Sequence, residues 1–204
     1  MSTGTIALRG RLGMRRIPAP KIGIGWKISN LANVWPGVWR HSLARALKMN
    51  HMLGTLEAVL KRADGSTVNF GLVSAKLVTT AFCEFMVDQL IAEDSEFGDF
   101  KYHDSGTGVT GANITDTAME TESTEQVDEL RAVGSQVEGT SVQYSSVGTI
   151  TYDGTGGAIT EHGLFSDTRI GGGTLMDRHT FAAINVVATD SIQFTYTLTA
   201  TAGG

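Results

Sequence analysis

Three consecutive residues, His103, Asp104 and Ser105, are of the types that make up a nucleophilic triad. A triad needs its base, nucleophile and orienting acid to meet in space, and neighbouring side chains on a strand point to opposite faces. The stretch 104–108 (DSGTG) also resembles a phosphate-binding loop, but it lacks the Gly-Lys-Ser/Thr element and a helical pattern after it. We therefore expect a polar turn here, with no catalytic role.

Four residues further along, Glu161, His162, Asp177 and His179, are of metal-ligating types. On strands, Glu161 and His162 would diverge, whereas Asp177 and His179 would share a face but supply only half of a zinc site. A surface salt bridge or a turn cap is the expected role, and we predict no metal and no cofactor. The single cysteine, Cys83, is expected to be a small buried apolar residue on a helix. The sequence thus predicts a protein that is not an enzyme; the enzymatic alternative is a hydrolase that uses His103 or His162.

Charge is divided unevenly along the 204 residues. Residues 1–62 contain eleven Lys or Arg and one acid, Glu57, whereas the other 142 residues contain five basic and twenty acidic residues. Such a split favours a basic segment that docks on something acidic. The acidic partner could be nucleic acid, another protein, a neighbouring copy or the chain's own acidic part.

The basic segment, residues 1–50, also contains every tryptophan of the chain. Its glycines and prolines argue against a continuous helix, apart from a short one over 41–52. We expect an extended arm that becomes buried against a partner, because tryptophan and arginine are common interface anchors. The predicted partner-docking residues are Arg15, Arg16, Trp26, Trp35, Trp39 and Arg40. Nucleic acid is the less favoured partner, since only Arg15 and Arg16 form a tight basic pair.

Residues 51–204 are predicted to form a β-rich body. An Asp64-Gly65 turn indicates a hairpin between strands at 55–61 and 67–72, and a helix is expected near 80–92 with Thr79 or Thr80 as its N-cap. Short strands follow, including one at 116–121, and the clearest is 191–199, where apolar and polar residues alternate strictly. The predicted fold class is mainly β: an antiparallel β-sandwich or jelly-roll-like body with one short helix and an extended N-terminal arm.

Targeting segments are not expected. Residues 1–30 lack the continuous apolar core and small-residue cleavage site of a signal peptide, and no apolar stretch approaches the length of a membrane helix. We therefore predict no membrane partner.

Several segments of the second half resemble a widespread group of tailed-bacteriophage virion proteins. The resemblance covers roughly residues 55–204, and its segments are structural rather than catalytic. The matching segments are FKYHDSGTG (100–108), DTAM (116–119), GSQVEGTSVQYSSVGTITYD (134–153), AITEHGLFS (158–166), GGTLMDRHTFAAINV (172–186) and DSIQFTYTLT (190–199), and VTTAF (78–82) resembles the region before them.

The resemblance implies a role in virion structure, in a particle assembled in the host cytoplasm. Within that role we favour a capsid decoration or cement protein, dimeric or trimeric, whose arm binds the major capsid protein or other virion proteins. A tail, baseplate or fibre-associated protein is the alternative within the virion. A nucleic-acid-binding protein that uses the basic segment is the alternative from another class.

Overall fold

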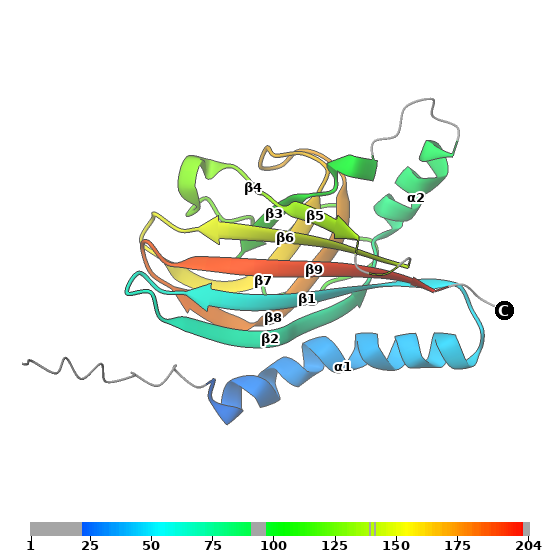
Figure 1. Cartoon of the computed structure of the whole chain (residues 1–204), viewed down its shortest axis with the longest axis horizontal. Coiled ribbons are helices and arrows are strands. Elements are labelled where there is room, and N and C mark those ends of the chain that lie inside the picture. The colour runs from blue at the N-terminus through cyan, green and yellow to red at the C-terminus, as the bar shows by residue number, and fades with distance from the viewer. Residues whose placement is uncertain (1–21, 91–96, 139, 141, 202–204) are drawn as a thin grey trace, which may run out of the picture.

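The computed structural model describes residues 22–90, 97–138, 140 and 142–201. In these residues the chain is mainly β, as predicted, with two antiparallel sheets and two α-helices. The first sheet has the strand order β2-β1-β9-β6-β5 and the second the order β4-β3-β7-β8 (Figure 1). Their bounds are β1 His51–Lys61, β2 Thr67–Leu77, β3 Tyr102–Gly106, β4 Ala132–Val133, β5 Ser135–Glu138, β6 Gln143–Thr151, β7 Gly157–Phe165, β8 Leu175–Val186 and β9 Ser191–Thr201.

The two sheets face each other across one hydrophobic core and form what we call the two-sheet body. β9 supplies Ile192, Phe194 and Tyr196, all without exposed surface, so the predicted alternation of the last strand is confirmed. The opposite sheet contributes apolar side chains such as Leu164 and Ile184 to the same cluster. Burial of these side chains on the inner faces holds the sheets together.

Turns follow the local sequence signals closely. The Asp64-Gly65 turn joins β1 to β2 as predicted, and Gly65 has the positive φ of 82° that such a turn needs. The glycine-rich turn after β6 connects strands of different sheets, because β7 pairs with β3 and β8 and does not pair with β6. The predicted strand at 116–121 is wrong: these residues belong to a long irregular connection between β3 and β4.

The prediction of a single helix is also wrong, and so is that of an extended arm for residues Ile24–Ala46, which form the 23-residue helix α1; residues 1–21 of the predicted arm lie outside the described residues. Pro36 lies inside it and Gly25 near its start, both normally unfavourable in a helix. α1 lies along β2 and β8, the edge strands of the two sheets, where the body would otherwise be open (Figure 1). Docking on this edge outweighs the weak helical propensity of the segment.

The second helix, α2, spans Thr80–Gln89, within the predicted range. Thr79 is its N-cap: the Thr79 hydroxyl accepts a hydrogen bond from the Phe82 amide at 3.2 Å. Two short 3₁₀ turns, Phe97–Asp99 and Val127–Glu129, complete the described elements. No helix of the described residues is both long and apolar enough to cross a membrane.

Candidate functional site

The side of α1 that faces away from the two-sheet body is apolar. Its residues recur at spacings of three and four, which places them on one face of the helix. We call this set the outer stripe; it consists of Ile24, Ile28, Leu31, Trp35, Val38 and Trp39. Ile24 is 77% exposed and Trp35 65% exposed. A row of large apolar side chains this open to water marks a surface that a partner covers.

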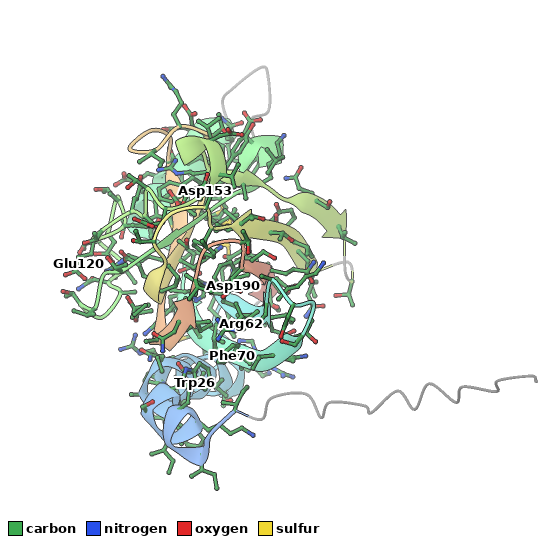
Figure 2. The ribbon with its side chains drawn as sticks, turned by 90° about the vertical axis from the view of Figure 1, so that its left-hand side faces the viewer. Trp26, Arg62, Phe70, Glu120, Asp153 and Asp190 are labelled. Atoms are coloured by element: carbon green, nitrogen blue, oxygen red, sulfur yellow. The ribbon has the colours of Figure 1, made fainter. Side chains whose placement is uncertain are left out.

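The opposite side of α1 is bound to the body by polar contacts. Trp26 donates its indole N–H toward the carbonyl oxygens of Ala182 and Ala183 at 3.1 Å each, and its ring lies 4.8 Å from that of Phe70. Figure 2 shows Trp26 and Phe70 next to each other where α1 meets the body. Trp26, one of the predicted docking residues, therefore anchors α1 on its own chain.

Asn30 makes a second attachment that joins both sheets. Its side-chain N–H donates to the Val73 carbonyl of β2 at 2.7 Å, and its oxygen accepts from the Ala182 amide of β8 at 2.9 Å. Asn30 is almost completely buried, so these hydrogen bonds lie shielded from water. The side chain thereby fixes α1 across the edge of the body.

Gly37 lets α1 approach β2 closely. A Cβ atom at this position would lie 2.0 Å from the carbonyl oxygen of Ala75, closer than any side chain tolerates. The glycine that argued against a helix in the sequence is thus required by the packing of that helix. The helical spacing of Ile24, Ile28, Leu31 and Trp35 was the signal that could have predicted α1.

α1 thus presents Trp26, Asn30 and Gly37 to its own body and the aliphatic and aromatic outer stripe to solvent. A helix on the surface of a monomeric protein normally has the reverse arrangement, with its apolar side on the core. Of the predicted docking residues, Trp35, Trp39 and Arg40 are exposed, and Arg15 and Arg16 lie outside the described residues. Basic side chains accompany the stripe, since α1 and the three residues after it contain Lys27, Arg40, Arg45 and Lys48 and no acid.

Arg40 also borders a cleft of about 380 Å³ between α1, β2 and the connection after β3. Lys76 and Arg178 contribute to its lining. Burial lowers the pKa of Lys76, and the positive charges of Arg40 and Arg178 act in the same direction. Arg178 is already bound to carboxylates, so the cleft is not simply a concentration of free positive charge.

Three histidines lie together inside the body. Nδ1 of His103 is 2.9 Å from Nε2 of His162, and Nε2 of His103 is 2.8 Å from the Ser146 hydroxyl. His179 follows on β8, with its Nε2 3.2 Å from Asp177 Oδ2. The predicted polar turn at 103–105 is wrong: these residues lie on β3 and are fully buried.

Glu161, the neighbour of His162 on β7, serves the other face of the second sheet. Glu161 and His162 do diverge, as predicted, and Glu161 accepts a hydrogen bond from Arg178 Nε at 2.7 Å. Glu161 also accepts from the backbone amides of Gly108 and Thr121, at 3.0 and 2.8 Å. The expectation of a surface role is wrong, because these buried groups fasten the long connection after β3 to the sheet.

Arg131, on the same connection between β3 and β4, is surrounded by a similar set of hydrogen bonds. Its guanidinium donates to Asp104 at 3.1 Å, to Glu122 at 2.6 Å, and to the carbonyl oxygens of Asp167 and Gly172. Burial raises the pKa of Asp104 to about 6, while hydrogen bonds and the Arg131 charge act against this rise. Arg131 is itself fully buried, so its role is to hold loops together.

A substrate could not reach the polar side chains in the interior of the body. His103, Ser105, His162 and His179 have no exposed surface, so a substrate has no route to them without opening the body. Within the part of the chain that the structure describes, no group of three or more His, Cys, Asp or Glu side chains could hold a metal ion. The outer stripe of α1 is therefore the candidate functional site.

Comparison of the chain with family models, with curated proteins and with solved structures gives no match.

Proposed function

We propose that this chain is a non-enzymatic structural subunit of a tailed-bacteriophage virion, a capsid decoration or cement protein that docks on neighbouring virion proteins through the outer stripe of α1. The observation that carries the proposal is the exposed row from Ile24 to Trp39 on a helix whose other side is bound to its own body. Exposed aromatic residues accompanied by arginine are the usual anchors of protein interfaces. This role implies the major capsid protein or other virion proteins as partners, further copies of this chain among them.

The two-sheet body is suited to a structural role in a particle. Its histidine-containing interior is closed, and its buried ion pairs fasten long loops to a sheet. We infer a β-sandwich with jelly-roll-like connections, supported by the face-to-face sheets and by the β6–β7 and β8–β9 links between them. The sequence resemblance of residues 55–204 to phage virion proteins points to the same role.

Nucleic-acid binding has weaker support in the site geometry. Trp26 is engaged with its own chain, and Trp35 and Trp39 lie in a row of aliphatic side chains. A stacking platform for bases instead interleaves exposed aromatic residues with a track of basic ones. The row of Ile, Leu and Val side chains fits a protein surface better.

The proposal is tested by the copy number of this protein in purified phage particles, measured against the major capsid subunit. A simple whole-number ratio to that subunit supports decoration of the head. A small number of copies per particle assigns the protein to the tail, baseplate or fibres, and absence from the particle overturns the proposal. Particles carrying Trp35→Ser/Trp39→Ser should lose the protein, whereas those carrying Val109→Ser, which alters a more exposed apolar residue elsewhere, should retain it.

A further inference from the structure

A second helix of the same chain also has an unpartnered face. On α2, Val87 is 64% exposed and Leu90, the residue after the helix, is 83% exposed. Phe82 and Phe85 point the other way and pack with Phe100 of the body. A shallow hollow of about 300 Å³ lies on the exposed side and is lined by Cys83, Glu84, Val87 and Asp88. An aromatic anchor of a partner fits such a recess.

The two exposed helix faces have opposite charge. Residues 77–100, which include α2, contain six acids and no basic residue. Residues 22–50, which include α1, contain four basic residues and no acid. Apolar faces surrounded by opposite charges attract each other and exclude partners of like charge.

The two faces cannot meet within one molecule. α1 lies along β2 and β8 with its outer stripe turned away from the body, whereas α2, which follows β2 and contacts β8, rises from the right-hand end of the strands, apart from α1 (Figure 1). A contact between them therefore needs a second copy. Since the two surfaces differ, the contact is head-to-tail, and repetition of it makes a ring or a chain of subunits.

We propose that the outer stripe of α1 docks on the α2 face of a second copy of this protein. Trp35 and Trp39 supply the aromatic anchors, and Glu84 and Asp88 lie opposite Arg40 and Arg45. A symmetric contact between two α1 helices is disfavoured, because it would bring only basic side chains together. The inference rests on the outer stripe being a docking surface, as in the proposed function, and names its partner.

The experiment is analytical ultracentrifugation of the purified full-length chain over a range of protein and salt concentrations. The wild-type protein should associate reversibly, and added salt should weaken the association because the charges are exposed. Trp35→Ser/Trp39→Ser and, separately, Glu84→Lys/Asp88→Lys should each raise the dissociation constant at least about tenfold, as loss of central anchors or charge pairs does.

Two matched controls separate the faces from general surface effects. Val109→Ser removes an apolar side chain that is 79% exposed on the connection after β3. Glu57→Lys/Asp153→Lys makes the same change of net charge as Glu84→Lys/Asp88→Lys at exposed positions away from α2. Both control proteins should associate like the wild type, and circular dichroism should show that every variant is folded.

Mixing the two defective variants distinguishes a head-to-tail contact from a symmetric one. Each variant keeps one intact face, so a mixture should form a 1:1 dimer and stop there, although neither variant associates alone. A monomeric wild-type protein overturns the inference, and so does association that depends on α1 but is indifferent to the α2 changes. Binding of α1 to anionic phosphatidylserine vesicles in place of self-association overturns it as well; the copy number in particles is measured separately and tests the proposed function alone.

Discussion

Inside the two-sheet body, Nδ1 of His103 lies 2.9 Å from Nε2 of His162, and neither side chain has exposed surface. Burial lowers the pKa of His103 to about 3 and that of His162 well below its ordinary value; the latter is lowered further by the neighbouring histidines. Protonation of either imidazole would place an uncompensated charge in the hydrophobic core, which would destabilise the folded state.

This pair predicts a loss of stability in mild acid. In the unfolded chain both histidines take up protons below a pH of about 6.5, whereas in the folded chain they do not. The stabilisation is therefore complete above that pH and declines as the pH falls toward the folded-state values. Each histidine contributes a slope of up to about 1.4 kcal/mol per pH unit. Urea unfolding at several pH values between 7 and 5 measures the slope.

Asp104 reduces this pH dependence of the free energy of unfolding. The pKa of Asp104 is raised to about 6, so the folded state takes up a proton there before the unfolded state does. The slope of the wild-type protein is therefore smaller than two histidines alone would give. His162→Phe should flatten the slope further. A slope equal in wild type and His162→Phe would contradict the role of the buried pair.

Arg131 is predicted to be the most sensitive charged residue. Replacing it by Met leaves Asp104 buried without its counter-ion, and such a loss typically costs about 3–5 kcal/mol in the free energy of unfolding. The double variant Arg131→Met/Asp104→Asn should recover part of this loss, because the buried charge is then absent. Arg169→Met, which alters an exposed ion pair with Asp167, should leave the unfolding midpoint unchanged. Denaturant unfolding of the four proteins measures the effects.

Gly37 and Gly25 provide a matched pair within α1. Gly37→Ala should lower the free energy of unfolding by about 1–3 kcal/mol, since its Cβ would collide with the Ala75 carbonyl. Gly25→Ala should raise it by up to about 1 kcal/mol, because no atom lies near the added Cβ and alanine favours the helix. Thermal unfolding followed by circular dichroism compares them. Equal effects of the two substitutions would show that α1 does not dock on β2 as described.

Asp190 is predicted to fix the turn between β8 and β9. It accepts hydrogen bonds from Arg62 at 2.6 Å and from the backbone amides of Ala63 and Val187, at 3.2 and 3.0 Å. Figure 2 shows Arg62 and Asp190 close together. Asp190→Ala leaves these donors without their acceptor, which should cost about 2–4 kcal/mol. Arg62→Ala should cost less, since the two backbone contacts of Asp190 remain; hydrogen exchange of the Ala63 and Val187 amides tests the contacts directly.

The sequence alone determined the features that depend on neighbouring residues. The alternation in β9, the Asp64-Gly65 turn and the Thr79 cap each follow from the conformational preferences of a few adjacent residues. The division of charge between residues 1–62 and the rest is likewise a property of the sequence. The virion role inferred from resemblance stays a prediction, because no structural feature tests it.

Only the tertiary structure decided what distant segments do to one another. Gly37 and Pro36 both lower the intrinsic stability of a helix. α1 nevertheless forms, because its packing on β2 and β8 stabilises it by more than these residues destabilise it. His103 and His162 are 59 residues apart and meet only because β3 pairs with β7. The exposure of the outer stripe also depends on tertiary contacts. Trp26 and Asn30 fix one side of α1 on the body, and the helix geometry therefore leaves the apolar side in solvent.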